Sequence, residues 1–488
     1  MGTGPRMQPS LSLLEPQLIQ RILGEAFALI WERGVTVQGP VAAQLLSAAG
    51  ARVENGVAQI PESLARRALE TAPPRFSLYN RAGEPAVQYG GDHVQFDPGS
   101  SCVHVLDPET LEHRLAKTAD LVRLVQVAEM LPQYAAQSTA VVCNEVPEGM
   151  GDLYRLYVVL RYSDKPIVTG AFTPHTTPVM IDMLAADSGG HEALRAKPRA
   201  VFDVCPSPPL HFSEFAERSL VDLARAWVPA EIVPMPLAGV AAPVTLAGTI
   251  VQHAAESLSA ITIHQLAQPG APVVWGGAPA IFDMRSGITA MGAVETFMLN
   301  VACAQVGKAL HLPTHGYLIG SDAKTLDAQA GQESGMAAMA GVLGGINMIS
   351  GAGMLDSLAC HSAEKLLLDG ESIAMAQRLR QGVHAGTESL AIEMFRKAGA
   401  QGDFLKLADT RRLFRQEQHI PGKVIDRGSL RCWEEGGKKN AFARAKEKVD
   451  ELVAAYQRPE LKAGAEEALR SIVEEQAKRE GMVRLPKF

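Results

Sequence analysis

The amino-acid sequence predicts an α/β protein built around a parallel sheet, in the form of a (β/α)8 TIM barrel. Strand-like apolar runs alternate with helical patterns throughout residues 131–395, and such alternation is typical of parallel sheets. The runs end in Gly or Pro followed by polar residues, which is where barrels of this class keep their chemistry. We therefore divide the chain into an N-terminal helical and β-hairpin cap region (1–130), the barrel (131–395) and a C-terminal helical extension (396–488).

The composition is that of a globular protein. Of 488 residues, 47% are hydrophobic and 20% are charged, with no signature of disorder. The formal net charge of −7 argues against a nucleic-acid partner, which would require a basic face. The N-terminal segment lacks the apolar core of a signal peptide, and no apolar run approaches the length of about 20 residues that a membrane span needs. We expect a cytoplasmic protein.

The cysteines indicate neither a disulfide framework nor a structural zinc site, because the six of them are scattered without CxxC spacing. We predict no metal site. Two alternatives stay open: Cys143, Cys205, Cys360 and His361 could converge on a metal ion, or Cys360 could act as a nucleophile beside His361. Both are disfavoured, because buried free cysteines are common as small apolar residues and sequence neighbours usually point in different directions.

The N-terminal region is expected to begin with helices at 18–33, 39–48 and 61–71, where apolar residues recur at helical spacing before Gly or after Pro. Short runs between 76 and 113, broken by Gly and Pro, predict hairpin strands, and a further helix is expected over 118–130. The chemically suggestive part is Phe96-Asp97-Pro98-Gly99. It can be an ordinary Asx turn or a loop that reaches over the active site and holds a cation.

The central region supplies seven strand-like runs separated by helical patterns such as 212–227, 245–268 and 292–306. The runs lie at 136–143, 166–170, 200–205, 232–236, 272–276, 309–314 and 346–350. A short eighth strand at 365–368, followed by a helix through Arg380, would close the barrel.

The polar and aromatic residues beyond the strand ends should face one common mouth. Those expected there are Glu145, Phe172, His211, Phe212, Trp275, Phe282, Asp283, His315, Tyr317, His361 and Glu364. Any one of them is more often packed or solvated than catalytic, so their shared position at strand ends is the stronger signal.

The stretch 311–333 is the densest of these segments and follows the pattern strand, polar loop, helix. Its polar residues are His315, Tyr317, Asp322, Lys324, Asp327, Gln329 and Glu333. In the structural interpretation Asp327 caps the helix and the others are solvated. In the functional interpretation they line the mouth of the barrel.

The C-terminal extension is expected to hold polar helical turns over 402–419 and charge-dense helix from 441 to about 480. Such charge patterning marks a solvated helix face, while the apolar stripe packs on the barrel or on a second subunit. We expect a homo-oligomer.

Standard motifs do not explain the mouth: the sequence has no early GxGxxG, no P-loop and no HExxH. Instead, LPTHGYLIGSDAKTLDAQAGQE (312–333) and GGINMISGAGMLDSLACHSAEKLLLDGE (344–371) resemble the trimethylamine methyltransferase superfamily. The opening LLEPQLIQRILGEAFALIWERGVTV and the ending IDRGSLRCWEEGGKKNAFARAKEKVDELV are similar to it as well. The resemblance covers essentially the whole chain.

The resemblance implies a (β/α)8 barrel that moves a methyl group from an amine to the Co(I) form of a corrinoid carried on a separate small protein. Founding members of the family carry pyrrolysine at the mouth, whereas Met354-Leu355-Asp356-Ser357-Leu358 stands at the equivalent place. The chain therefore resembles the branch without pyrrolysine, which includes glycine betaine methyltransferases. That branch implies a quaternary amine substrate, because a quaternary ammonium departs as a neutral tertiary amine without a proton or covalent activation.

Such a reaction asks the protein to orient one N–CH3 bond and exclude water, for which a cage of aromatic faces and a carboxylate suffices. The expected cage residues are Phe96, Phe172, Phe212, Trp275, Phe282 and Tyr317, with Asp322, Gln329 and Glu333 as further substrate-binding residues. Asp97 is the expected carboxylate, and His315 and His361 are the expected catalytic donors at the mouth, towards the carboxylate of a betaine.

The resemblance also implies that the corrinoid (cobalamin) is a methyl acceptor held by a small partner protein and is not bound tightly by this chain. The sequence lacks a DxHxxG cobalamin-ligand signature, and the Ala- and Gly-rich segment 327–345 predicts a low-relief docking surface. In the alternative interpretation these small residues only let the helix pack tightly on the barrel. Two rival functions stay open: a barrel lyase or aldolase-like enzyme with Lys324 as Schiff-base former, and a non-catalytic quaternary-amine-binding protein.

Overall fold

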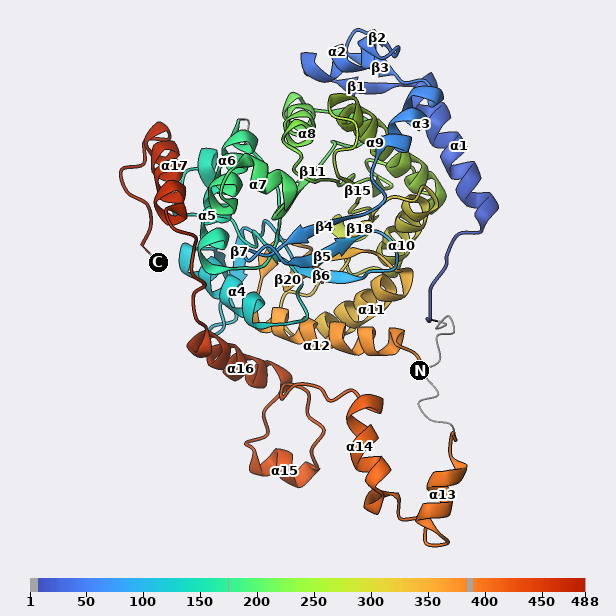
Figure 1. Ribbon diagram of the computed structural model, residues 1–488, viewed down its shortest axis with the longest axis vertical. Coiled ribbons are helices and arrows are strands. Elements are labelled where there is room, and N and C mark those ends of the chain that lie inside the picture. The colour runs from blue at the N-terminus through green and yellow to red at the C-terminus, as the bar shows by residue number, and fades with distance from the viewer. Residues whose placement is uncertain (1–7, 174, 384–388, 488) are drawn as a thin grey trace.

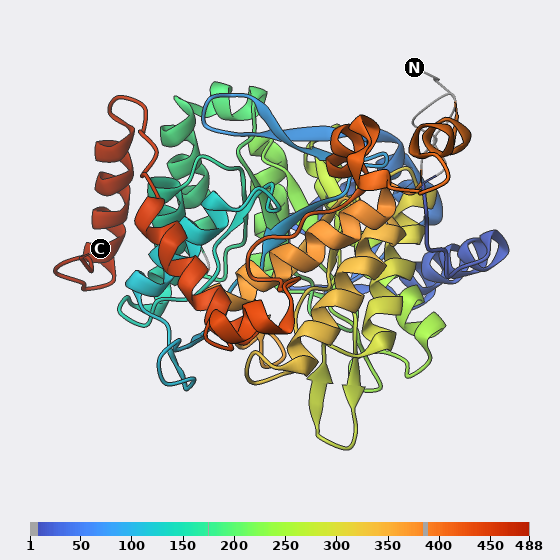
Figure 2. The same cartoon turned by 90° about the horizontal axis from the view of Figure 1, so that it is seen from below.

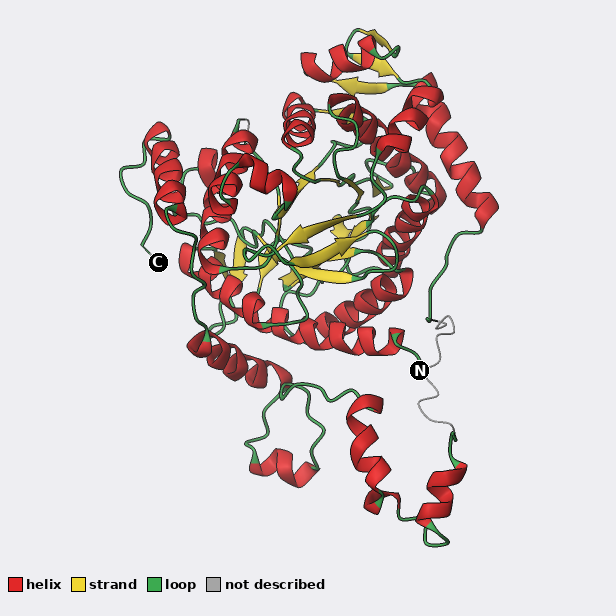
Figure 3. Cartoon of the chain, in the orientation of Figure 1, coloured by secondary structure: helices red, strands yellow, loops and turns green. Residues whose placement is uncertain are grey.

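The computed structural model describes residues 8–173, 175–383 and 389–487 and folds them around a ring of short strands (Figure 1). Residues 1–7, which belong to the N-terminal segment considered above, lie outside the described residues. Helices lie outside and strands inside, as Figure 3 shows. The predicted α/β class with parallel sheets is confirmed.

Within the described residues, eight parallel strands follow one another around the ring. Five form one sheet: β9 (Gln137–Ser138), β10 (Ile167–Thr169), β11 (Ala200–Val204), β13 (Ala230–Ile232) and β15 (Val273–Trp275). Three form the other: β18 (His315–Tyr317), β19 (Met348–Ala352) and β6 (Gln95–Pro98).

Two contacts join the sheets into the ring. Trp275 at the end of β15 forms a parallel bridge with Thr314, directly before β18. On the other side, the backbone N–H of Ala135 donates to the carbonyl oxygen of Phe96 over 2.9 Å and thereby links β6 to the start of β9.

A helix follows each strand of the ring, and the helices lie around the ring on its outside (Figure 1). Seen from below, the gold and orange helices lie in front of the ring (Figure 2). In chain order the helices that follow the strands are α4 (Thr118–Met130), α5 (Gly151–Tyr162), α6 (Thr176–Ser188), α8 (Glu214–Ala226), α9 (Leu246–Ala267), α10 (Val294–Ala309), α11 (Ala328–Gly344) and α12 (Ala363–Arg380), with the short α7 (His191–Ala196) after α6. Several begin at a capping side chain: Ser213 accepts from the Ala216 N–H, and Asp327 accepts from the N–H groups of Gln329 and Ala330. These caps satisfy amides that the first helical turn leaves without partners.

Strands lie at or beside six of the predicted runs, whereas the run at 309–314 precedes β18, which begins at His315. The predicted eighth strand at 365–368 is wrong, because these residues lie inside α12. The strand that completes the ring is β6, in the region predicted to hold only hairpins, and it pairs parallel with β19. The predicted division at residue 130 therefore separates β6 from the strands beside it.

A hairpin fills one end of the ring. β4 (Phe76–Tyr79) and β5 (Pro85–Tyr89) pair antiparallel and cross the ring in Figure 1. Leu78, Val87 and Tyr89 of the hairpin pack against inward-facing side chains of the strands, among them Val201 and Val274. This apolar contact closes the end of the ring at which the strands begin.

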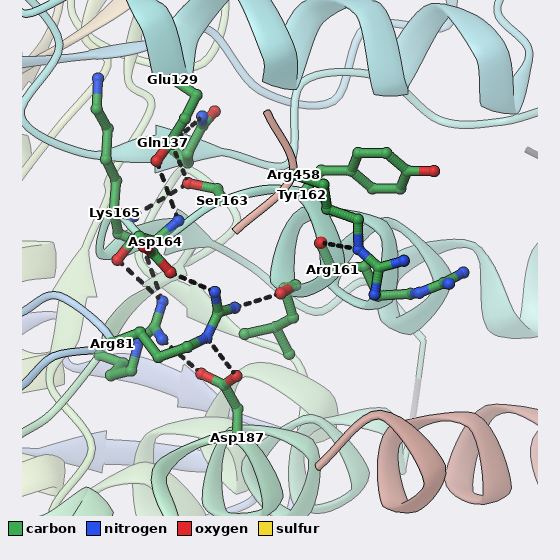
Figure 4. Close-up of polar contacts among 12 residues, drawn as sticks. Arg81, Glu129, Gln137, Arg161, Tyr162, Ser163, Asp164, Lys165, Asp187 and Arg458 are labelled. Carbon is green, nitrogen blue, oxygen red and sulfur yellow. Dashed lines mark hydrogen bonds and ion pairs between the residues drawn. The ribbon is translucent and has the colours of Figure 1, made fainter. Parts of the chain in front are cut away.

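A buried ionic cluster fixes this hairpin to the surrounding helices (Figure 4). Arg81, just after β4, donates to Asp187 over 3.0 Å and also pairs with Asp164. Asp187, at the end of α6, accepts from Arg199 over 2.6 Å on its other oxygen. Because both arginines and Asp187 are almost fully buried, each charge depends on the others for its stabilisation.

The N-terminal elements pack on the outside of the ring. They are α1 (Pro16–Glu32), β1 (Val35–Val37), α2 (Pro40–Ala48), β2 (Arg52–Glu54), β3 (Val57–Gln59) and α3 (Glu62–Thr71), so all three predicted helices and the helix at 118–130 are confirmed. β1 pairs parallel with β12 (His211–Phe212) and antiparallel with β3.

Two small sheets lie at the end of the ring where the strands finish. One holds β20 (Met354–Leu355), β21 (Cys360–His361), β7 (His104–Leu106) and β8 (His113–Leu115). The other holds β14 (Leu237–Ala238), β16 (Ala280–Asp283) and β17 (Ile288–Ala290).

The C-terminal part is helical, as predicted. Its helices are α13 (Ile392–Ala398), α14 (Ala408–Glu417), α15 (Leu430–Glu435), α16 (Ala441–Ala455) and α17 (Ala465–Arg479). α16 and α17 pack on the ring through buried residues such as Val449 and Val473. Across the described part of the chain, no helix combines the length and apolar character needed to cross a membrane.

Candidate functional site

A cavity of ≈ 550 Å³ opens where the strands end. Its wall comes from the ends of β11 and β18, the loops after β10 and β13, and the start of α8. The residues that line it include Ser100, Ser101, Gly170, Phe172, Phe202, Asp203, Ser207, Phe215, Met235, Tyr317, Met354 and Leu358. This volume falls within the range of small-molecule sites, and its wall is largely apolar with a few polar groups, as such sites usually are.

The polar part of the wall begins at Asp203, which lies on β11 between apolar residues. The register pairs Asp203 with Glu231 on the neighbouring strand β13, so the two carboxyl groups lie side by side. One oxygen of Asp203, Oδ1, is buried without a hydrogen-bond partner in the described structure. Glu231 is fully buried and accepts a hydrogen bond from the Tyr89 hydroxyl over 2.9 Å.

A chain of contacts continues behind the cavity. His315 Nδ1 lies 2.8 Å from Glu231 Oε1, and its Nε2 lies 2.9 Å from the hydroxyl of Ser350. That hydroxyl donates to Asp97 Oδ1 over 2.6 Å. The second oxygen of Asp97, Oδ2, is buried without a partner in the described structure. Three carboxyl groups therefore surround one imidazole ring in a nearly dry layer above the hairpin.

These neighbours shift the protonation of the layer. Burial lowers the pKa of His315, but Glu231, Asp203 and Asp97 outweigh this and raise it to about 9, so the ring is an imidazolium near neutral pH. Burial and the adjacent charge of Glu231 raise the pKa of Asp203 to about 8, against the lowering effect of His315 and Arg155. Burial also raises the pKa of Asp97 well above its usual range. The single charge of the His315 imidazolium is thus shared among three carboxyl groups, which is too little to keep all of them ionised.

Arg155 is a second buried cation, and it lies behind another part of the wall. Its guanidinium donates to the Ser101 hydroxyl over 2.9 Å and to the carbonyl oxygen of Thr139 over 2.7 Å. It also lies over the ring of Phe172, 4.5 Å from the centroid. Its Nε is buried without a partner in the described structure.

Of the side chains expected at the mouth, Phe172 and Tyr317 line the cavity. Phe172 is 52% exposed. The hydroxyl of Tyr317 accepts from the Ser100 N–H over 2.7 Å and contacts the Met354 sulfur at 3.2 Å. Asp97 and His315 lie in the layer behind the cavity and contact each other through Ser350.

The remaining expected cage residues lie elsewhere, which corrects their assignment to the cavity wall. Phe96 and Trp275 are buried in the core, and the indole N–H of Trp275 donates to the carbonyl oxygen of Cys303 over 2.9 Å. Phe212 is buried in β12 where that strand pairs with β1. Phe282 lies in β16, paired with Thr289 of β17.

The polar residues of the loop after β18 hold that loop together. Asp322 accepts from the N–H groups of Met291 and Gly292, both over 2.9 Å. Glu333 accepts from the Ser321 hydroxyl over 2.6 Å and from the exposed Gln329 over 2.8 Å. The polar groups of Asp322, Gln329 and Glu333 are thus used within the loop and the neighbouring helix, and their binding of substrate stays a prediction.

The surroundings of His361 and Lys324 determine which chemical roles these two residues can have. His361 is fully buried in β21, and burial lowers its pKa to about 3, so the ring is neutral. Lys324 is exposed, and its ammonium contacts the Asp322 carbonyl oxygen at 2.7 Å and Asp356 at 3.2 Å. A solvated, paired ammonium is a poor Schiff-base former, which disfavours the lyase interpretation.

The described residues hold no cluster of metal-ligating side chains.

Asp203, Glu231 and Arg155 were not predicted from the sequence. A signal was present, since Asp203 interrupts the strand run AVFDV and Glu231 the run AEI. An ionisable residue inside a buried strand is costly unless it has partners or a task. Arg155, by contrast, lies in the helix GDLYRLYVVLRY, which also carries Asp152 and Arg161, so the sequence does not distinguish it from a solvated arginine.

Comparison with known proteins identifies relatives over nearly the whole chain. The family model for trimethylamine methyltransferase (MTTB) matches residues 3–481. Trimethylamine methyltransferase MttB2 of Methanosarcina mazei is 32% identical over 479 residues, which are 95% of each chain. Trimethylamine methyltransferase MttB of Desulfitobacterium hafniense is 29% identical over 92% of this chain and 91% of its own. A glycine betaine methyltransferase of Desulfitobacterium hafniense is 27% identical over 98% of this chain and 99% of its own.

Among solved structures, the monomethylamine methyltransferase MtmB of Methanosarcina barkeri is similar with a TM-score of 0.52. The likeness covers 91% of this chain and 89% of that one at 11% sequence identity. It supports a shared fold.

Proposed function

Since this chain belongs to the trimethylamine methyltransferase family, we propose that it demethylates a quaternary amine and methylates the Co(I) corrinoid of a partner protein. In this reaction the N–CH3 bond breaks with its electron pair left on nitrogen. The methyl group bonds to cobalt, which is thereby oxidised from Co(I) to Co(III), and a neutral tertiary amine departs. No proton is transferred to the leaving group.

The observation that carries the proposal is the mostly apolar cavity with a carboxyl group in its wall. Aromatic faces and a nearby carboxylate stabilise a methylated ammonium without needing hydrogen bonds from it. We assign Phe172 and Tyr317, together with the newly found Phe202 and Phe215, to this wall. Each cation–π contact supplies about 0.5–2 kcal/mol, so two or three would hold a small quaternary amine. One face of Phe172 already carries the Arg155 guanidinium, which leaves the opposite face for a ligand.

A quaternary rather than tertiary amine is supported by the loop 354–358. Met354 and Leu358, both of which border the cavity, stand where the resemblance expects pyrrolysine or its neighbours. Their thioether and alkyl groups pack against methyl groups but supply no electrophile that could activate a tertiary amine. The chain is therefore suited to a substrate that carries its own positive charge.

A betaine is favoured over a simple tetraalkylammonium because of Arg155. Its guanidinium reaches the cavity wall through Ser101, and burial lowers its pKa only to about 10, so it remains a cation. A carboxylate near Ser100 and Ser101 would face this charge. His315 and His361 are less suited to that role, because neither is among the residues that line the cavity and His361 is neutral.

We propose that the corrinoid enters with a separate protein that docks beside α11. On this helix Gly335 has open space around its missing side chain, and Met336 is 46% exposed. Gly335→Trp or Ala340→Trp should cripple methylation of a corrinoid protein and leave amine binding intact if docking occurs here. Methylation unaffected by both substitutions would place the docking surface elsewhere, and stoichiometric cobalamin copurifying with the isolated chain would contradict a separate carrier.

We further infer that the eight parallel strands close a (β/α)8 barrel. The two contacts that join the sheets and the similarity to MtmB support this architecture. We also propose a homo-oligomer, because α13, α14 and α15 have no buried residues and stand away from the ring in Figure 1. Light scattering after gel filtration measures the mass, and a monomer would contradict it.

The decisive experiment follows the spectrum of free Co(I) cobalamin with the purified chain. Glycine betaine, carnitine, proline betaine and choline are each added, and trimethylamine serves as the tertiary-amine control. We expect conversion to methylcobalamin with at least one quaternary amine and none with trimethylamine. Turnover of trimethylamine alone, or of none of these amines, would refute the proposal.

A further inference from the structure

We propose that Asp203 is the counter-ion of the substrate's ammonium group and that its carboxyl group releases a proton to solvent when the cation enters the cavity. This inference deepens the proposed function and rests on it for the identity of the ligand as a quaternary ammonium.

The position of Asp203 distinguishes it from the two other carboxyl groups of the layer. Asp203 lines the cavity, whereas Asp97 and Glu231 lie behind the wall. Glu231 is occupied by Tyr89 and His315. In the described structure the buried Oδ1 of Asp203 accepts no hydrogen bond, so Asp203 is the carboxyl group left for a ligand.

Charged and titratable groups face Asp203 from each element packed around it. They are Glu231 on β13, His315 and Tyr317 on β18, Asp97 on β6, Arg155 on α5, Tyr89 on the hairpin and Cys205 after β11. The nearest pairing is with Glu231, in register on the adjacent strand. That negative charge, together with burial, favours the neutral acid at Asp203 while the cavity holds no cation.

A cation in the cavity reverses this preference. An opposite charge within about 4–6 Å favours the ionised carboxylate by about 1–3 pKa units. Since the pKa of Asp203 without ligand is about 8, the acid is about nine-tenths protonated at pH 7 and would ionise on binding. The step is Asp203–COOH plus ammonium giving Asp203–COO⁻ paired with ammonium plus H⁺. The net charge buried in the site is therefore unchanged.

The same step helps the product to leave. Methyl transfer turns the ammonium into a neutral amine, so the Asp203 carboxylate loses its partner. It then takes up a proton again, as in the empty site, and the neutral amine is held only by apolar contacts. Asp203 would thus bind the substrate strongly and the product weakly.

The test measures binding of tetramethylammonium and glycine betaine by titration calorimetry between pH 6 and pH 9. For the natural chain we expect affinity to increase roughly fifty-fold over this range, since the competing proton is lost as the pH passes about 8. Titrations at pH 7 in two buffers of different ionisation heat should show about 0.8 protons released per cation bound, the value for a pKa lowered by about two units. The isostere 3,3-dimethylbutyrate keeps the carboxylate of glycine betaine but has carbon in place of the ammonium nitrogen, so it should bind no better at high pH than at low pH.

Asp203→Asn should remove both the pH dependence and the proton release, and its affinity should equal that of the natural chain near pH 6. Ser207→Ala, a charge-free change in the same wall, and Asp97→Asn, the rival carboxyl group, are the controls, and both should keep the pH dependence. Retention of proton release in Asp203→Asn, or its loss in Asp97→Asn instead, would overturn the assignment.

The natural chain alone also decides the matter if Asp203→Asn fails to fold, because pH-independent binding without proton release would overturn the proposal. The outcome remains separate from that of the proposed function. Proton-linked binding of the cation without methylation of cobalamin refutes the methyltransferase proposal and supports Asp203. Methylation of cobalamin with a pH-independent affinity for the cation supports the methyltransferase proposal and refutes the role of Asp203.

Discussion

Replacing Asp203 by Asn should stabilise the folded chain, and the gain should grow with pH. Burial beside Glu231 raises the pKa of Asp203 from 3.8 to about 8. A carboxyl group whose pKa is raised by folding contributes stability below its unfolded pKa, near 4, and this contribution is lost as pH rises through about 8. Asn stays neutral and escapes that loss.

The magnitude follows from the shift. About four pKa units at 1.36 kcal/mol each set an upper limit of about 5–6 kcal/mol above pH 8. The pH-dependent part of the difference should approach this limit at pH 9, because linkage ties it to the same two pKa values. For a chain of 488 residues the unfolding entropy is about 1 kcal/mol per degree, so this corresponds to an increase in melting temperature of about 5–6 °C.

The assay is urea unfolding at intervals from pH 4.5 to pH 9, with melting temperatures as a second measure. The difference between Asp203→Asn and the natural chain should be near zero at the acid end and reach a plateau above pH 8. Ser207→Ala, which changes the same wall without a titratable group, should show a constant difference. A gain that is constant or that shrinks as the pH rises would refute the reasoning.

Three further changes test other parts of the molecule. Asp187→Asn leaves two buried arginines without their shared carboxylate, so it should lower the unfolding free energy by about 3–5 kcal/mol in urea titrations, whereas the exposed Glu84→Gln should change it by less than about 0.5 kcal/mol. Trp275→Phe removes a buried indole donor and should lower stability by about 1–3 kcal/mol with KM unchanged, and a raised KM at full stability would show that Trp275 reaches the substrate after all. Gly99→Ala places a methyl group in conflict with the Met354 side chain, which must then move within the cavity wall. The change should weaken the binding of the larger carnitine more than that of tetramethylammonium in calorimetry. Equal losses for both ligands would argue against a displaced Met354.

The sequence predicts the alternation of strands and helices well because most strands of the ring are short apolar runs ended by Gly or Pro. It fails at 365–368, where three consecutive leucines fit a buried strand and a buried helix equally well. It also fails at β6. In that βα unit the strand and its helix α4 are separated by the β7–β8 hairpin, so the local pattern indicates hairpins. The eighth strand therefore comes from the N-terminal part of the chain and not from the segment after β19.

The site was predicted less completely than the fold. His315 is predicted because it follows an apolar run, and Asp97 because an Asp beside an aromatic residue and before a Pro-Gly turn can hold a cation. The structure connects the two through Ser350. Which face a short strand turns inward depends on pairing register, however, and a shift of one residue reverses it. Phe96 and Asp97 are neighbours on β6 and therefore point to opposite faces of the strand. The side chain of Phe96 enters the outer core, and the carboxyl group of Asp97 enters the interior of the ring of strands. The aromatic residues Phe202 and Phe215 could not be ranked above Phe212 or Trp275 without that register.

The pairing of β6 with β19 has a consequence for the synthesis of the chain on the ribosome. β6 is made early, yet the strand beside it lies about 250 positions later in the sequence. Until that later strand has left the exit tunnel, both β6 and β18 expose unpaired edges, which are templates for wrong partners. Contacts so distant in sequence slow folding, and a nascent chain released before residue 348 could never complete its ring. We expect such fragments to aggregate, and we expect the full-length chain to mature late, after most of its helices have formed.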